Sequence, residues 1–145
     1  GVVVTVVSDP GRDSCRSVVP QAVFGIQESG VLTAMARADG FGVFAIADGS
    51  IRRHRRTMAR MQVLDRLACE IALNMSVDES ARGAGTFDRL VEVGTTLMQQ
   101  GAGAVILGCA GMARHRAPLE AALGAPVIDP TQAAVAMALG ALLAG

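Results

Sequence analysis

The chain has 145 residues, of which 51% are hydrophobic, and this is enough to bury one substantial core. Thirteen basic and thirteen acidic residues leave no net charge, so there is no bulk electrostatic attraction to nucleic acid or to a membrane surface. The absence of tryptophan and tyrosine argues against base-stacking platforms, and no apolar run reaches the roughly 18 residues of a membrane span.

The chain contains three cysteines, Cys15, Cys69 and Cys109, an odd number without zinc-type spacing. This pattern predicts no disulfide framework and a reducing, cytoplasmic compartment. The two histidines, His54 and His115, lie among arginines and complete no ligand cluster, so no metal is expected. The valine-rich opening has no basic leader or cleavage site, so we expect no signal peptide.

Apolar β-branched runs alternate with helical patterns, which predicts βα units on a mostly parallel sheet. Strands are expected at residues 2–7, 22–26, 42–47, 69–73, 104–107 and 127–128. Helices are expected at residues 12–19, 28–38, 50–67, 86–100 and 119–123, and from residue 131 onward. Ser50 and Thr86 are expected N-caps, and Gly124 is expected at a helix C-terminus. The polar segment Ser76–Gly85 is the best linker candidate.

The most informative stretch is Gly108–Met112, directly after the apolar run at 104–107. A strand that leads straight into a cysteine brings a thiol to the carboxyl edge of a sheet, where open α/β proteins bind ligands. The neighbouring glycines allow close approach to the backbone, and a helix beginning after Gly111 would favour the thiolate. Cys109 is therefore a candidate base or nucleophile; the alternative is a buried cysteine packed as a small hydrophobe.

Four segments, in order, resemble one known family. The stretch Gly101–Pro130, with GAGAVILGCAGM followed by LGAPVIDP, resembles the C-terminal half of the aspartate/glutamate/hydantoin racemases, above all the hydantoin and allantoin racemase branch. Upstream, Ser8–Gly11 resembles the family's first active-site loop, Phe24–Glu28 its turn into a helix, and Phe41–Phe44 its central strand.

The resemblance implies an α/β fold of parallel sheets with flanking helices, arranged as two pseudo-symmetric lobes. Residues 1–27 together with 125–145 would form a partial first lobe, and residues 28–124 the second lobe, which carries the Cys109 loop. Family members carry a further segment before the strand that opens this chain, which begins at Gly1 without a methionine. We therefore expect upstream residues to have been removed or lost, and a longer natural protein or another subunit to cover the first lobe.

The resemblance also implies a cofactor-independent racemase or epimerase that acts at a carbon next to a carbonyl, in a hydantoin, ureide or related carboxylate. One thiol removes the proton and an opposed thiol returns it, while N–H and hydroxyl groups stabilise the enolate. Cys109 matches one thiol position. The expected protein is a homo-oligomer without nucleic-acid or membrane partners, and its expected substrate-binding residues are Ser8, Asp9, Gly25, Ala110 and Gly111.

One departure bears directly on this chemistry. Val6 stands where the family places its second thiol, and valine can neither donate nor accept a proton. The chain is therefore expected to invert its substrate poorly. A decarboxylase of the arylmalonate type, which needs one cysteine, and an inactive member that keeps the fold are the alternatives.

Two polar features have simpler interpretations. Ser8 and Asp9 belong to a Ser-Asp-Pro-Gly sequence that forms a turn without any ligand. The four arginines that flank His54 either attract an anionic ligand or form a solvated helix face.

Overall fold

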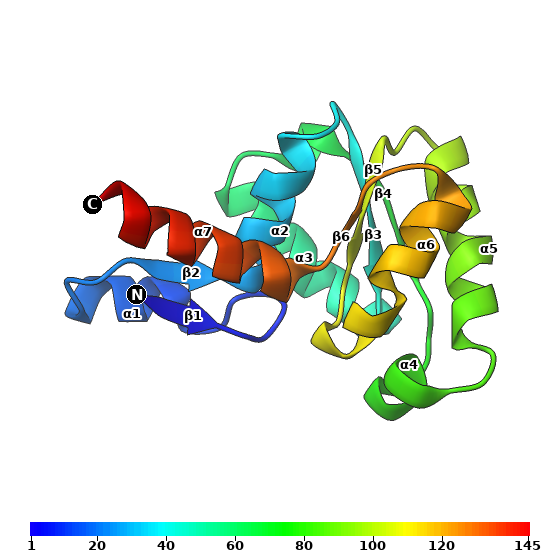
Figure 1. The fold of residues 1–145 in the computed structure, drawn as a ribbon, viewed down its shortest axis with the longest axis horizontal. Helices are drawn as coiled ribbons and strands as arrows, with labels where there is room; N and C mark the ends of the chain where they lie inside the picture. Colours follow the sequence, from blue (N-terminus) through cyan, green and yellow to red (C-terminus); the bar gives the residue numbers. More distant parts are fainter.

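The computed structural model describes residues 1–145 as an α/β fold with two parallel sheets (Figure 1). The strands are β1 (Val2–Val4), β2 (Val23–Gly25), β3 (Phe41–Ala45), β4 (Leu67–Ala72), β5 (Ala104–Leu107) and β6 (Val127–Ile128). The α-helices are α1 (Arg12–Val18), α2 (Ile26–Met35), α3 (Asp48–Arg60), α4 (Val77–Arg82), α5 (Thr86–Gln99), α6 (Arg116–Leu123) and α7 (Pro130–Ala144). Two 3-10 helices complete the chain, η1 (Leu64–Arg66) and η2 (Ala110–His115).

The larger sheet has the order β4-β3-β5-β6 with all strands parallel. Successive side chains of a strand point to opposite faces, so β3 and β5 contribute to two cores. Phe44 and Leu107 pack in the core beneath α5 and α6, whereas Val43 and Ile106 pack in the core beneath α2 and α3. Both faces are covered, which explains why these strands are continuously apolar in sequence.

The paths that leave β3 and β5 define where a ligand can bind. The chain continues from β3 into α3 on one face of the sheet, and from β5 through η2 into α6 on the opposite face (Figure 1). Because the two strands are neighbours, their carboxyl ends separate into a crevice, the usual ligand position in open α/β sheets. This crevice lies beside Ile46 and Cys109.

The smaller sheet contains only β1 and β2, which pair in parallel from Val2 opposite Val23 to Val4 opposite Gly25. It packs against α1 and α7, and α7 packs in turn along α2. Residues 127–128, which the sequence groups with the first lobe, pair with β5 in the larger sheet.

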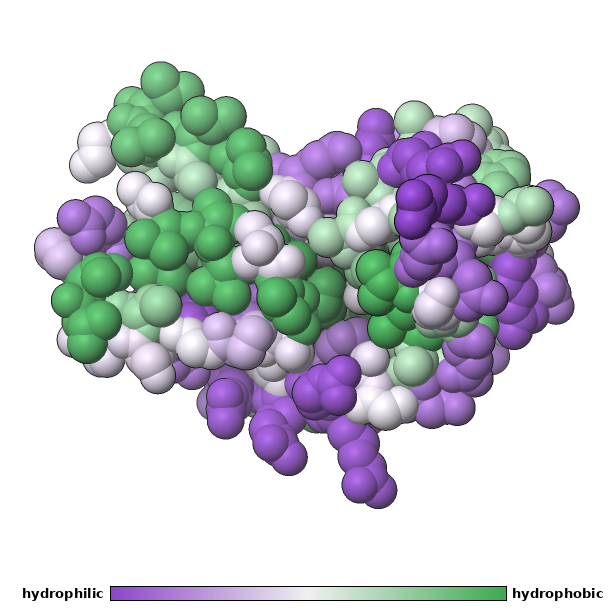
Figure 2. All heavy atoms as spheres, turned by 90° about the horizontal axis from the view of Figure 1, so that it is seen from below, coloured by the Kyte–Doolittle hydropathy of each residue, from purple (hydrophilic) through white to green (hydrophobic).

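Hydrophobic side chains remain exposed on α1 and α7: Val18, Val135, Leu139, Leu142 and Leu143. Figure 2 shows hydrophobic surface gathered on the side that holds α7 and the smaller sheet. Apolar surface of this kind is typical of interfaces. No helix combines the length and the apolar character that crossing a membrane requires.

The predicted order of strands and helices is confirmed, but Ser76–Gly85 is not a linker. It contains α4, whose N-terminus is closed by reciprocal bonds between Ser76 and Glu79. This Ser-x-x-Glu capping box satisfies helix N–H groups that would otherwise lack partners. The segment is polar because it is a short surface helix, not because it is unstructured.

Two predicted caps were also wrong. Helix α3 begins at Asp48, whose N–H donates to Asn74 Oδ1, so Ser50 lies buried within its first turn. Helix α5 begins at Thr86 itself, whose hydroxyl donates to Glu79 O. The prediction for Gly124 is confirmed: it ends α6 with φ of 65°.

The first strand is shorter than predicted, ending at Val4 rather than at residue 7. Residues 5–9 instead form a turn, closed by the Asp9 N–H donating to Val6 O at 3.0 Å. Both Ser8 and Asp9 adopt positive φ, 87° and 49°. This turn carries one wall of the site described next.

Candidate active site

Cys109 lies two residues after the end of β5, at the carboxyl edge of the larger sheet, where the sequence predicts it. Gly108 permits this position: a Cβ there would lie 1.8 Å from Phe44 O on the neighbouring strand. Only glycine allows the two strands to stay paired so close to the cysteine. The following element is η2 from Ala110, not an α-helix after Gly111, and α6 begins only at Arg116.

The thiol is in contact with α4. Ser80 Oγ lies 3.9 Å from Cys109 Sγ, and the same hydroxyl donates to Val77 O at 2.7 Å. A Cβ added to Gly111 would lie 3.6 Å from both the sulfur and Ser80 Oγ, so this glycine borders the thiol. Sequence reasoning missed Ser80 because it treated the segment as a linker; the Ser-x-x-Glu spacing was the signal that could have found the helix.

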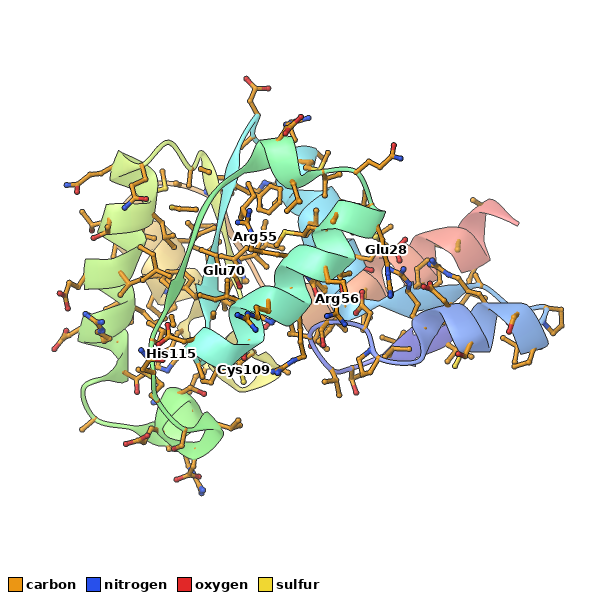
Figure 3. All side chains as sticks on the ribbon, turned by 180° about the vertical axis from the view of Figure 1, so that it is seen from behind. Glu28, Arg55, Arg56, Glu70, Cys109 and His115 are labelled. Atoms are coloured by element: carbon orange, nitrogen blue, oxygen red, sulfur yellow. The ribbon has the colours of Figure 1, made fainter.

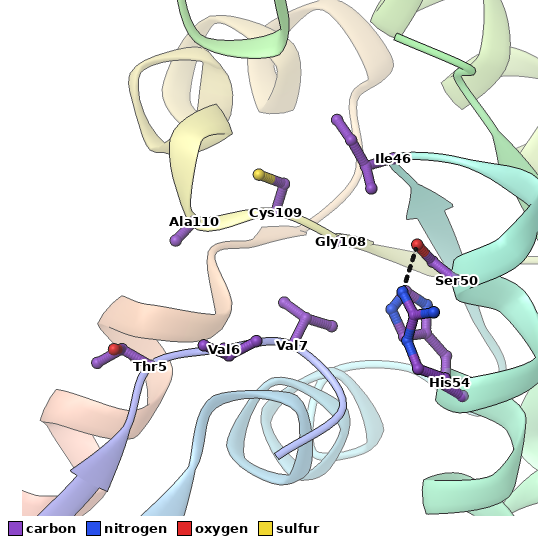
Figure 4. A pocket seen from close by; sticks show the side chains of 10 residues that line it. Thr5, Val6, Val7, Ile46, Ser50, His54, Gly108, Cys109 and Ala110 are labelled. Carbon is purple, nitrogen blue, oxygen red and sulfur yellow. Dashed lines mark hydrogen bonds between the residues drawn. The ribbon is translucent and has the colours of Figure 1, made fainter. Parts of the chain in front are cut away.

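A cavity of about 230 Å³ opens at this sheet edge. Its lining residues are Thr5, Val6, Val7, Ile46, Ser50, Arg53, His54, Gly108, Cys109 and Ala110. Val6 and Cys109 belong to facing walls, one formed by the turn after β1 and the other by the loop after β5 (Figure 4). The two positions that the resemblance pairs are therefore brought to one cavity.

The third wall is the start of α3, near which Cys109 lies (Figure 3). His54 Nδ1 is hydrogen-bonded to Glu70 Oε1 of β4, and the two side chains are only 3% and 1% exposed. Arg53 also lines the cavity and donates to Ser50 Oγ at 3.2 Å. The sequence grouped His54 with its arginine neighbours; a glutamate inside the otherwise apolar strand β4 was the signal for a buried partner.

Arginines of α3 also line a second depression, and Arg53 belongs to both. Arg53, Arg56 and Arg60 surround a polar hollow of about 170 Å³ together with Ser8 and Thr57. Ser8 lies there through its backbone, whose carbonyl accepts from Thr57 Oγ1 at 3.3 Å. Ser8 does not line the cavity that holds Cys109.

Asp9 and Gly25 support the turn rather than line the cavity. The Asp9 carboxylate accepts the N–H groups of Gln27 and Glu28, each at 2.9 Å, and so caps α2. Gly25 leaves room for this carboxylate, because a Cβ there would lie 2.2 Å from it. Burial raises the pKa of Asp9, opposed by the two N–H groups and by Arg12, which lies 3.7 Å away.

Of the predicted substrate contacts, Ala110 alone shares the cavity with Cys109, and Gly111 borders the thiol from the side of α4. Ser8, Asp9 and Gly25 are brought close to the cavity wall without lining it. Their roles toward a substrate stay predictions.

Comparison with known proteins shows which family the chain is related to. Residues 1–138 match the sequence model described as Asp/Glu/Hydantoin racemase. The chain belongs to this family.

Individual members of the family show the same relationship. The chain is 30% identical over 143 residues to hydantoin racemase of Paenarthrobacter aurescens, which covers 94% of this chain and 58% of the relative. It is 31% identical over 155 positions to hydantoin racemase of Rhizobium meliloti, covering 99% and 60%. Allantoin racemase from Klebsiella pneumoniae superposes with a TM-score of 0.92 at 27% identity, over 99% of this chain and 59% of that one.

The chain therefore spans 58% to 60% of the length of these two hydantoin racemases. Within that span the chain shares the fold of this allantoin racemase.

Proposed function

We propose that this racemase-family protein moves a proton at a carbon next to a carbonyl, as a cofactor-independent racemase or epimerase of hydantoin- or allantoin-type compounds. Cys109 acts as an acid/base residue in the proposal. The observation that carries it is the position of the thiol, which lines a cavity at the point where β3 and β5 diverge. At about 230 Å³ the cavity suits a small ring or ureide rather than a large cofactor.

The chemistry follows from the groups around the sulfur. A thiolate at Cys109 removes the proton and leaves an enolate, whose negative charge needs hydrogen-bond donors. The N–H groups of Ala110 and Gly111 begin η2, where helix N–H groups lack partners within the helix. Ser80 Oγ contacts the sulfur at 3.9 Å, while its single proton is donated to Val77 O at 2.7 Å.

The facing wall favours a second candidate. Val6 supplies no proton, so no thiol serves the opposite face of the substrate. A decarboxylase needs only one thiol, because loss of carbon dioxide itself creates the enolate and one face is then protonated. Release of carbon dioxide from a disubstituted malonate would identify this reaction.

The test of the proposal is the decay of optical rotation of an enantiopure 5-substituted hydantoin. Cys109→Ala should slow racemisation by about 10²–10⁴, the usual worth of general acid–base assistance. Cys69→Ala is the matched control: this thiol packs against the core and lines no part of the cavity, so racemisation should persist. No racemisation by the unmodified protein, or equal rates in both variants, would contradict the proposal.

A further inference from the structure

We propose that His54, oriented by Glu70, is the second acid/base group of this cavity and serves the substrate face that Val6 leaves without a thiol. The inference rests on the proposed proton-transfer function and names the residue that completes it. It starts from a buried histidine–carboxylate pair whose histidine lines the same cavity as the thiol.

The first support is position. His54 lies in the second turn of α3 and lines the same cavity as Cys109, which enters from the loop after β5. The two residues approach the cavity from different walls (Figure 4). A substrate held between these walls would therefore present different faces to the sulfur and to the imidazole.

The second support is the buried hydrogen bond. Glu70 lies on β4 with its side chain 1% exposed, and its only hydrogen bond is to His54 Nδ1, since Oε2 has no partner. A carboxylate that accepts from Nδ1–H fixes the tautomer and the orientation of the ring. His54 Nε2 makes no hydrogen bond within the protein and is the nitrogen left for a ligand.

The third support comes from the other cavity residues. The Arg53 guanidinium has N–H donors and no acceptor, and the Ser50 hydroxyl already accepts from it. Apart from Cys109, the remaining side chains are aliphatic or, at Thr5, a hydroxyl. Histidine is the residue type that both gives and takes protons near neutrality. His54 is therefore the one cavity group besides the thiol that is suited to this exchange.

The step balances in protons and charge. The Cys109 thiolate takes the proton from the substrate carbon and becomes a thiol, and the electron pair of the C–H bond passes into the enolate. His54 Nε2–H then protonates the opposite face of that carbon and is left as neutral imidazole. In the reverse direction the neutral imidazole removes the proton and the thiol returns one, so each enantiomer meets its own base.

The experiment follows deuterium uptake in D₂O separately for the two enantiomers of a 5-substituted hydantoin. His54→Gln should stop inversion, a loss of about 10²–10⁴, while Cys109 still exchanges the proton of one enantiomer with retention. Cys109→Ser should give the mirror result, with exchange of the other enantiomer only. Arg55→Gln, a change at an exposed residue of the same helix that lies outside the cavity, should leave inversion unchanged.

A second substitution distinguishes loss of the proton donor from a rearranged cavity as the cause of lost inversion. Adding Val6→Cys to His54→Gln puts a thiol on the facing wall, and it should restore inversion and exchange of both enantiomers. Failure of this rescue in a folded protein would overturn the assignment, because the loss would then reflect a rearranged cavity. Inversion that continues in His54→Gln but depends on Cys109 would overturn it while leaving the proposed function standing.

A further variant controls for destabilisation of the fold by His54→Gln. Removing His54 leaves Glu70 buried without its partner, which is costly. If His54→Gln melts early, the double variant His54→Gln/Glu70→Gln removes the charge as well and carries the same test, with thermal unfolding as the check. Absence of any exchange in the unmodified protein would instead count against the proposed function itself.

Discussion

On one wall of the cavity the chain leaves β5 and presents a thiol, whereas on the facing wall it leaves β1 and presents Val6. The first wall is fixed by backbone, since Gly108 brings β5 against the carbonyl of Phe44 in the larger sheet. The second is fixed by a side chain, since the Asp9 carboxylate ties its turn to the start of α2. The wall with the thiol is therefore built into the main sheet, and the other depends on one buried carboxylate.

Gly108→Ala tests the backbone wall and should have the largest effect. The added Cβ would meet Phe44 O at 1.8 Å, so β3 and β5 must separate. We expect the free energy of unfolding to fall by about 4 kcal/mol or more, measured by urea denaturation. Gly49→Ala, a helical position with open space around it, is the control and should be neutral or slightly stabilising. A Gly108→Ala protein as stable as the parent would show that the wall with the thiol does not depend on the close approach of β5 to Phe44 O.

Gly25→Ala tests the wall that depends on a side chain. Its Cβ would lie 2.2 Å from the Asp9 carboxylate, which can rotate away at the expense of the α2 cap. The expected loss is about 2 kcal/mol, with faster hydrogen exchange of the Gln27 and Glu28 amides.

Combining Gly25→Ala with Asp9→Ala tests whether both changes act through the same helix cap. Once the carboxylate is gone, Gly25→Ala should add little to the loss, because both changes remove the same cap. Additive losses in the double variant would show that Gly25 has some other role.

Ser80→Ala tests the contact between the Ser80 hydroxyl and the Cys109 thiol, and it should have the smallest effect. Loss of a weak contact at 3.9 Å is expected to slow racemisation about threefold to tenfold, corresponding to about 1 kcal/mol. Ser17→Ala is matched to it, since Ser17 Oγ also donates to a carbonyl three residues earlier in a helix, Ser14 O at 2.7 Å. Equal rates for both variants would remove Ser80 from the site.

The sequence predicts the thiol wall well because its determinants are local. An apolar run, a glycine and a cysteine are consecutive, and their order alone places the sulfur at a sheet edge. The other features depend on pairs distant in sequence. Asp9 caps a helix 18 residues later, and His54 meets Glu70 across 16 residues and two elements. No local pattern reports such pairs, so they emerge only once the strands are in place.

The central claim is that Cys109 is the working thiol of this cavity, and site-resolved alkylation tests it most directly. Iodoacetamide should modify Cys109 faster than Cys15 or Cys69, and Cys69 should need higher pH because burial raises the pKa of its thiol. The racemisation rate, measured in the same samples, should fall in proportion to the fraction of Cys109 modified. Full racemisation after complete modification of Cys109, or loss that instead follows Cys69, would contradict the account.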